Sequence, residues 1–297
     1  MSLFKCEHLN KTIGDYRLKD ISFELEPGTV LGLIGVNGSG KTTLLRSILG
    51  SYRLDEDPAD SGELWLGGKH FKNDMKAYRS SIAYVLQESP FPRYMTVKEI
   101  GETYGHYYKG FDLEKYLKLI KDYEVPEKKW HDWLSKGQKI RVQLAFALSY
   151  PASLYIMDEP VGNLDVEFRD VFYDTVRALM ANENCSVILS SHLVTELEHI
   201  VDDLLWLSKK DNTGYTRYSG SIDDLKNNYR LLSVAGESAA GIPKELIIGA
   251  KLNTSHNEYM LYSENGNFDL VPAGLQDTLR YPELQEIMYY TEKGNKE

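Results

Sequence analysis

Apolar runs alternate with helix-like patterns through most of this chain. Residues 29–34, TVLGLI, predict a buried strand, and residues 43–49, TLLRSIL, predict a helix that Gly50 closes. The same alternation continues with a helix over 136–149, a strand over 154–158, a helix over 168–181 and a strand over 187–191. Strands that alternate with helices favour a parallel sheet covered on both faces. The predicted fold class is therefore α/β.

The first 68 residues carry a different pattern. Residues 21–25 and 63–66 alternate apolar and polar positions, which predicts strands with one exposed face. We therefore expect a mixed sheet, with flanking helices, around the segment at 29–49. Residues 82–86 predict a further strand, which Gln87 closes.

A helical insert, from about residue 88 to 150, interrupts the α/β pattern. Thr96 and Glu99 stand at the spacing of a capping box and predict the start of one helix. Asp112 is expected to cap a second helix, and Pro126 is expected to begin a third, short one. The α/β core resumes after this insert.

The C-terminal part of the chain predicts a second, smaller domain. A turn at Asp211–Gly214 suggests that the first domain, residues 1–220, is ending. Residues 221–297 predict a small α+β extension. The elements expected there are strands near Leu246 and Tyr259 and a final helix from Pro282 to Tyr290.

The most specific motif is the glycine-rich octapeptide GVNGSGKT at residues 35–42, between a predicted strand and a predicted helix. Glycine lets the backbone curl so that successive N–H groups point at phosphate oxygens, and the helix N-terminus favours the same anion. In such a loop Lys41 reaches the β- and γ-phosphates of a nucleoside triphosphate, and the Thr42 hydroxyl binds Mg²⁺. The residues expected to bind the nucleotide are Gly35, Asn37, Gly38, Ser39, Gly40, Lys41, Thr42 and Thr43.

Charge and composition restrict the partners and the compartment. The chain has 297 residues, with 34 Lys and Arg against 44 Asp and Glu, and its net charge of −10 repels nucleic-acid backbones. No nucleic-acid partner is expected. Cys6 and Cys185 have neither metal-ligand nor redox spacing, which fits two inert thiols. The sequence shows no secretory signal and no run of about 18 apolar residues, so we expect a cytoplasmic protein.

Two carboxylates end the apolar strand at 154–158, at the position where ligands bind in a parallel sheet. We expect Asp158 to hold Mg²⁺, directly or through water. Glu159 is then placed to polarise the attacking water as a general base, a role worth about 10²–10⁴-fold in rate. A helix-capping or solvent-facing acid is the alternative for Glu159 on the strand pattern alone.

The pentapeptide LSKGQ at residues 134–138 begins the next predicted helix. Ser135 and Gln138 stand at capping-box spacing, so the free N–H groups of this helix start are expected to face outward as an anion site. An ordinary helix start explains both residues equally well. The combination favours the anion site, because the glycine-rich loop, Gln87, this pentapeptide, the two carboxylates and His192 follow one another in one order.

With these motifs, residues 1 to about 220 resemble the nucleotide-binding domain of ATP-binding cassette (ABC) transporters, a P-loop NTPase core. The resemblance identifies residues 134–138 as the signature, residues 162–165 as the loop after the catalytic acid, and His192 as the switch histidine. It implies that two such domains face each other head to tail, with ATP between the phosphate loop of one and the signature helix of the other. Ser135 and Gly137 would then contact the γ-phosphate bound by the partner chain, and Gln138 and Asp165 count among the nucleotide-binding residues on the same ground.

The resemblance also assigns roles to three single residues. Tyr16 would stack on adenine, with a turn tyrosine as the alternative. Gln87 would touch Mg²⁺ or its water and relay occupancy to a membrane partner through the helical insert. His192 would hydrogen-bond the γ-phosphate and position the water, whereas taken alone it would be a satisfied buried histidine. One position departs from the family, since Lys136 stands where the signature has Gly. The hydroxyl and N–H groups on either side of it remain, so anion binding is expected to persist.

The function that the resemblance implies is ATP hydrolysis by the energising subunit of an ABC transporter, with ATP and Mg²⁺ as cofactors. Its partners would be a second copy or a related ATPase subunit, and a separate integral-membrane subunit. The protein would therefore lie at the inner face of the cell membrane. The resemblance is nearest to exporter subunits for drugs, lantibiotics or other antimicrobial peptides, because those carry a C-terminal extension. An importer subunit is the main alternative.

Two further classes of function fit the sequence less well than transport. A soluble cassette ATPase acting on ribosomes or chromosomes would carry two cassettes or a long heptad insert, and this sequence has neither. A nucleotide sensor without hydrolysis would lack Glu159 or His192, and both are present. Transport remains the favoured function.

Overall fold

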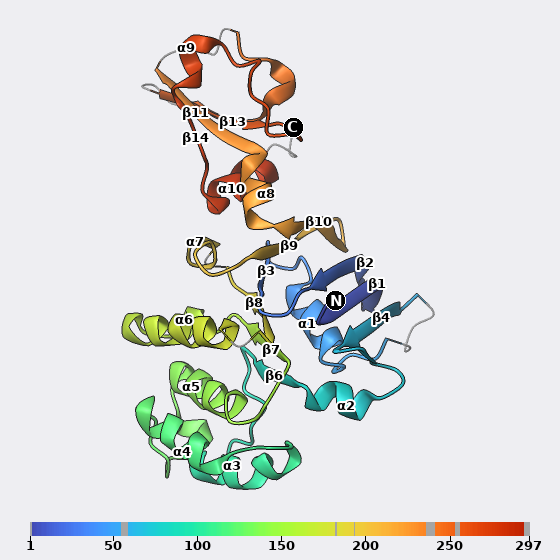
Figure 1. The fold of residues 1–297 in the computed structure, drawn as a ribbon, viewed down its shortest axis with the longest axis vertical. Helices are drawn as coiled ribbons and strands as arrows, with labels where there is room; N and C mark the ends of the chain where they lie inside the picture. Colours follow the sequence, from blue (N-terminus) through green and yellow to red (C-terminus); the bar gives the residue numbers. More distant parts are fainter. Residues whose placement is uncertain are drawn as a thin grey trace. The chain divides into compact units, whose positions relative to one another are not determined.

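The computed structural model describes residues 2–54, 59–181, 183–192, 194–235, 241–252 and 256–293, which form two compact units (Figure 1). The first unit comprises Met1–Leu193 and Ile200–Ser219, and the second comprises Val194–His199 and Gly220–Glu297. The division at Ser219 lies next to the boundary expected from the sequence. Residues 194–199, expected in the first domain, pack with the second unit instead.

A ten-stranded mixed sheet forms the centre of the first unit. Its strands are β1 (Phe4–Ile13), β2 (Tyr16–Leu25), β3 (Val30–Gly35), β4 (Ser61–Leu66), β5 (Lys69–His70), β6 (Ile82–Val85), β7 (Leu154–Asp158), β8 (Ser186–Ser190), β9 (Asp203–Lys210) and β10 (Thr213–Ser221). They lie in the order β5-β4-β1-β2-β10-β9-β3-β8-β7-β6. The strands from β9 through β3, β8 and β7 to β6 pair parallel, while β1 pairs antiparallel with β2 and β4. The predicted mixed α/β fold is confirmed.

The parallel strands form where the sequence is continuously apolar. All five residues of β7 and of β8 are buried, as expected for strands covered on both faces. Their register aligns Asp158 with Ser190, and Ser190 in turn with Leu33 of β3. The carboxyl ends of three strands therefore meet at one edge of the sheet, directly before the phosphate loop.

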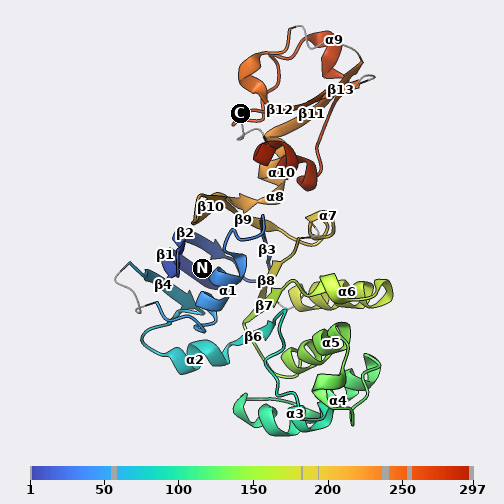
Figure 2. The same ribbon diagram turned by 180° about the vertical axis from the view of Figure 1, so that it is seen from behind.

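The helices of the first unit follow the predicted order, apart from a helix at Met75–Ser80 that was not predicted. They are α1 (Lys41–Ile48), α2 (Met75–Ser80), α3 (Val97–Tyr104), α4 (Leu113–Asp122), α5 (Lys136–Ala147) and α6 (Val166–Met180), with short 3₁₀ turns at Gly105–Tyr107, His131–Trp133 and Val161–Asn163. Helix α1 packs against β3 and β7, and α6 packs against β8. Helix α5 packs against β6, α4 packs against α5, and α3 packs against α4, and the three helices lie together in both views (Figures 1 and 2).

Three local predictions in this unit need correction. The helix expected from Pro126 does not form, because the carbonyls of Glu127 and Lys129 accept the first N–H groups of α3 instead of helical ones. Helix α6 begins at Val166, two residues earlier than predicted, because Asp165 caps it through the N–H of Phe168. Strand β6 ends at Val85, so Leu86, which was predicted to be its last residue, lies outside the strand.

The second unit is a four-stranded sheet with short helices. Its elements are α7 (Val194–Leu197), α8 (Ile222–Asn227), β11 (Tyr229–Ala235), a 3₁₀ turn at Lys244–Leu246, β12 (Ile247–Leu252), β13 (His256–Tyr262), α9 (Ala273–Gln276), β14 (Leu279–Arg280) and α10 (Leu284–Lys293). The strands lie in the order β12-β13-β11-β14 and pair antiparallel.

The elements expected around Tyr259 and at the final helix are present in this unit. Leu246, expected near a strand, lies in the 3₁₀ turn just before β12, and β11 and β14 were not predicted. Helix α7 is held here by Glu198, which accepts the Leu284 N–H at 3.0 Å and pairs with Lys226. These contacts explain why a segment from the middle of the chain packs with its C-terminal end.

Candidate active site

The glycine-rich loop joins β3 to the N-terminus of α1. Gly40 precedes the helix at φ 102°, a backbone conformation that favours glycine, and an added β-carbon would lie 2.2 Å from the Tyr16 hydroxyl oxygen. Among the residues that the structure describes, no side chain caps α1. The first N–H groups of the helix are therefore available to an anion, as the sequence predicts.

Lys41 lies within this loop and is largely buried, with 8% of its surface exposed. Its Nζ donates to the carbonyl oxygen of Gly35 at 2.7 Å. The ammonium group therefore stays inside the curve of the loop, where the phosphates of a nucleotide would lie.

Asp158 is placed at the loop by two hydroxyl groups. The Thr42 Oγ1 donates to Asp158 Oδ2 at 3.1 Å, and the Ser190 Oγ donates to Asp158 Oδ1 at 2.6 Å. Asp158 is 3% exposed. The contact between Thr42 and Asp158 joins residues 116 positions apart and brings the two predicted metal-binding side chains together.

Glu159 turns out of the strand direction immediately after Asp158. Its φ of 51° lies in the left-handed region, which costs a non-glycine residue about 1–2 kcal/mol. The Glu159 N–H donates to the Ser190 Oγ at 3.0 Å, which supports this conformation. Its Oε2 accepts the backbone N–H of His192 at 3.1 Å and lies 2.5 Å from His192 Nδ1. The two predicted catalytic side chains are therefore direct neighbours.

A cavity of about 740 Å³ opens over these groups. The predicted residues that line it are Tyr16, Asn37, Gly38, Gly40, Lys41, Thr42, Thr43, Gln87, Glu159 and His192. Ile13, Tyr52 and Lys209 line it as well and were not predicted. Gly35 and Ser39 do not line the cavity. A β-carbon on Gly35 would lie 2.2 Å from the Leu207 carbonyl oxygen, and Ser39 is fully buried.

Tyr16 lies against Gly40 of the phosphate loop as well as lining the cavity. Its hydroxyl group is buried beside Gly40 and Gly214, and burial raises the pKa of Tyr16 to about 12. Lys209 Nζ lies 5.8 Å from the centre of the Tyr16 ring. Stacking of adenine on the Tyr16 ring stays a prediction. Ile13, which lines the same cavity, is a second apolar side chain available to a base.

The start of α5 has the predicted capping box. The Gln138 N–H donates to Ser135 Oγ at 3.1 Å, and the Ser135 N–H donates to Gln138 Oε1 at 3.2 Å. Lys136 is the first residue of a regular helix, so its backbone does not need glycine. Ser135, Gly137 and Gln138 are not among the residues that line the 740 Å³ cavity.

Asp165 also lies outside that cavity. Its Oδ1 accepts the Phe168 N–H at 2.9 Å, and its Oδ2 pairs with Arg141 of α5. The hydrogen bond from Phe168 lowers the pKa of the Asp165 carboxyl group. Within one chain, Asp165 therefore caps α6 and fastens it to α5, and its predicted contact with nucleotide stays a prediction.

Sequence reasoning missed two side chains that position the site. Ser190 holds both Asp158 and Glu159, and Gln143 of α5 bonds the backbone of Leu86, next to Gln87. A small polar residue at the end of the strand beside β7 was a usable signal for Ser190. Gln143 gave none, because a glutamine inside a helix pattern is ordinarily a surface residue.

Comparison with known proteins assigns the chain to a family. A sequence model described as ABC transporter matches residues 18–162. The ABC transporter ATP-binding protein YtrB of Bacillus subtilis is 29% identical over 234 residues, which cover 78% of this chain and 77% of that protein. The ABC-type transporter ATP-binding protein EcsA of the same organism is 31% identical over 230 residues, covering 73% and 86%. A solved structure of an ATP binding subunit of an ABC transporter shares the fold with a TM-score of 0.67 at 23% identity, covering 76% of this chain and 92% of that one.

The chain therefore belongs to the ABC transporter family, as an ATP-binding subunit. Hydrolysis of ATP is the activity of this family, which confirms the predicted ATPase. Relatives of similar identity are named for uptake as well as for export. Membership of the family therefore does not decide whether this subunit serves an exporter of drugs or peptides, as the sequence predicts, or an importer. No helix within the described residues is long and apolar enough to cross a membrane.

Proposed function

We propose that two copies of this chain, or one copy and a related subunit, bind head to tail around two ATP molecules and drive a separate membrane subunit. The observation that carries the proposal is the convergence of Lys41, Thr42, Glu159 and His192 on one cavity. Ser135 and Gly137 do not line the cavity of their own chain, which supports their supply by a second copy.

In this proposal the phosphate loop and Lys41 bind the triphosphate, and Glu159 accepts a proton from the attacking water. The water oxygen bonds to the γ-phosphorus while the bond to the β-phosphate oxygen breaks, which leaves ADP and inorganic phosphate. His192 orients the Glu159 carboxylate through its ring and its N–H, and it can donate to the γ-phosphate.

The residues around Thr42 fit a magnesium ion. Mg²⁺ prefers oxygen ligands and keeps phosphate oxygens and waters, and the Thr42 hydroxyl and Asp158 carboxylate already lie 3.1 Å apart. Gln87 lines the same cavity and offers an amide oxygen. Among the described residues, no group of three or more His, Cys, Asp or Glu side chains could hold a metal. These residues would therefore hold the ion together with the nucleotide, where it neutralises phosphate charge.

A mixing experiment tests whether the sites are shared between chains. Lys41→Ala and Ser135→Arg each damage a different half of every site, so each variant alone should retain no ATP. Mixed dimers regain one complete site, from the Lys41 of one chain and the Ser135 of the other. In a Glu159→Gln background, we expect ATP to be retained after rapid gel filtration only by the mixture. If the mixture retains no more ATP than the separate variants, the sites do not form across two chains.

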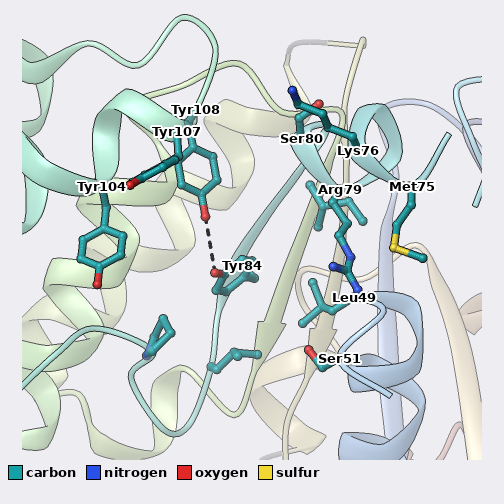
Figure 3. Close-up of a pocket in the computed structure, with 13 residues that line it drawn as sticks. Leu49, Ser51, Met75, Lys76, Arg79, Ser80, Tyr84, Tyr104, Tyr107 and Tyr108 are labelled. Carbon is teal, nitrogen blue, oxygen red and sulfur yellow. Dashed lines mark hydrogen bonds between the residues drawn. The ribbon is translucent and has the colours of Figure 1, made fainter. Parts of the chain in front are cut away.

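A second cavity in the first unit, of about 890 Å³, is suited to the membrane subunit (Figure 3). Tyr84 and Tyr108 face each other there with hydroxyl oxygens 3.4 Å apart, and Tyr107 is 78% exposed. Lys76 and Arg79 of α2 add positive charge to a largely apolar lining. Leu86 and Pro90 also line it, on either side of Gln87, which lines the nucleotide cavity. We propose that a short segment of the membrane subunit, apolar with an acidic residue, docks here.

Two exposed tyrosines make a matched test of this docking site. Tyr107 lines the cavity, whereas Tyr94 is 76% exposed and does not. We expect Tyr107→Ala to lose the membrane subunit on co-purification from detergent-solubilised membranes, while Tyr94→Ala keeps it. Equal recovery with both variants would place the membrane subunit elsewhere.

We propose that the transporter exports a drug or peptide. This subunit would lie at the inner face of the cell membrane. The second unit supports this proposal. It is a compact sheet with the helix α10, and the exporter subunits that this sequence resembles also carry a C-terminal extension. Reconstitution of the co-purified complex into vesicles with ATP outside tests this, because export from the cell then appears as ATP-dependent accumulation inside the vesicles. Depletion of preloaded cargo would indicate an importer.

A further inference from the structure

Helix α5 is fastened to the segment before Gln87 by one buried side chain. The Gln143 Oε1 accepts the Leu86 N–H at 3.0 Å, and the Gln143 Nε2 donates to the Leu86 carbonyl oxygen at 3.0 Å. Gln143 is 2% exposed. Its amide therefore pairs with both polar groups of one residue, as the backbone of a neighbouring strand would.

The position of Leu86 explains why this pairing is needed. Strand β6 is the edge strand of the sheet, and its last pair with β7 joins Val85 to Met157. Leu86 lies beyond that pair, so the sheet no longer supplies a partner for its N–H and carbonyl groups. Unpaired backbone groups away from water are costly, and the Gln143 amide satisfies both.

The same pairing links two parts of the proposed ATPase site. Leu86 directly precedes Gln87, which lines the nucleotide cavity. Gln143 lies two turns along α5 from Ser135 and Gly137, which face the second copy in the proposed function. The capping box of α5 and its buried residues, Ile140 and Val142 to Ala147, make it a rigid element. A displacement of the Gln87 segment is therefore passed to the start of α5.

We propose that Gln143 is a positioning residue that makes α5 move together with the Gln87 segment. Nucleotide bound at Gln87 then determines the position of Ser135 and Gly137. This inference rests on the proposed function and adds a physical connection between the two halves of the shared site. Gln143 touches neither nucleotide nor reacting atoms. Its loss should therefore affect turnover and dimer formation more than nucleotide affinity.

Replacement of Gln143 by an apolar residue of similar size tests the connection. In Gln143→Leu, we expect kcat to fall at least about tenfold while the KM for ATP and the Kd for ADP change less than about threefold. In a Glu159→Gln background, we expect Gln143→Leu to bind ATP but to lose ATP-dependent dimerisation in sedimentation. Gln143→Met, which is unbranched and adapts to its surroundings, should show the same split if the leucine variant folds poorly.

Tyr150→Phe is the matched control for a purely structural effect. The Tyr150 hydroxyl is buried and donates to the Ile82 carbonyl oxygen at 3.1 Å, at the other end of the same strand. Its loss should lower the melting temperature and leave kcat within about twofold. The proposal fails if Tyr150→Phe lowers kcat as much as Gln143→Leu, if Gln143→Leu keeps the parent kcat, or if KM and kcat change in proportion.

The two proposals fail in different ways. If Glu159→Gln with Gln143 intact stays monomeric with ATP, the proposed dimer is wrong, and the split between kcat and KM still decides the role of Gln143. If that variant dimerises and the added Gln143→Leu change has no effect on dimerisation or kcat, only the inference about Gln143 is wrong.

Discussion

Gly137 lies so close to Asn163 that a β-carbon at residue 137 would sit 2.7 Å from the Asn163 carbonyl oxygen. Gly137 is the second residue of α5, and Asn163 ends the 3₁₀ turn after Glu159. The preceding residue, Lys136, is exposed and helical. Close backbone approach therefore requires glycine at 137, while position 136 of the signature tolerates a side chain.

This contact predicts opposite outcomes for two neighbouring substitutions. Gly137→Ala must push the turn at Asn163 away from α5, so we expect kcat to fall at least about tenfold with little change in the Kd for ADP. Lys136→Ala should leave kcat within about twofold, because its side chain makes no such contact. ATP turnover and ADP titration measure both, and equal effects of the two changes would contradict the steric argument.

Glu159→Gln should separate ATP binding from ATP hydrolysis. Glutamine keeps the shape of the side chain and can still accept the His192 N–H, but it cannot take a proton from water. We expect turnover to fall by about 10²–10⁴-fold while ATP affinity is retained. Phosphate release and equilibrium binding of ATP measure the two quantities. Unchanged turnover would remove Glu159 from the role of general base.

A buried ion pair between β1 and the segment before β4 should contribute strongly to stability. Lys11 Nζ lies 2.6 Å from Asp60 Oδ2, and the two side chains are 3% and 0% exposed. Lys11→Met would leave the Asp60 charge buried, at a cost of about 3–5 kcal/mol in the free energy of unfolding. Lys5→Met removes only surface ion pairs with Glu7 and Glu24, which water and salt screen, so its effect on the free energy of unfolding should be much smaller. Denaturant unfolding measures both, and similar losses would show that the Lys11 pair is not special.

His131 should make the first unit less stable in mild acid. Burial lowers the pKa of His131 below its ordinary 6.5, and within the described residues neither ring nitrogen has a hydrogen-bond partner. Below pH 6.5 the unfolded chain takes up a proton at this residue before the folded chain does, so stability is lost as the pH falls.

His131→Phe should therefore reduce the loss of unfolding free energy between about pH 7.5 and pH 5.5. Phenylalanine can keep the packing of His131 against Phe91, whose ring centre lies 6.2 Å away. His106→Phe, at an exposed position, is the control and should leave the pH dependence as it is in the parent. If His131→Phe leaves the acid sensitivity unchanged, the buried imidazole of His131 is not the cause of that sensitivity in the parent protein.

Local patterns predicted most of the first unit correctly. Strand β7 and the caps at Thr96, Asp112 and Ser135 lie where the sequence places them, because a period of apolar residues and a capping side chain act within a few positions. The errors arose where distant groups compete for the same backbone. At Pro126, helix α3 takes the carbonyls that a further helix would have needed.

The phosphate loop, the two carboxylates and the order of the motifs were determined by the sequence alone, since a loop of fixed spacing between a strand and a helix has little conformational choice. Only the tertiary structure decided that Ser190 holds Asp158 from 32 residues away and that Gln143 holds Leu86 from 57 residues away. The physical reason is that these contacts depend on which strands are neighbours, on their register and on the packing of α5. A hydrophobic pattern records that a strand or helix is buried, but not which polar group will lie opposite it.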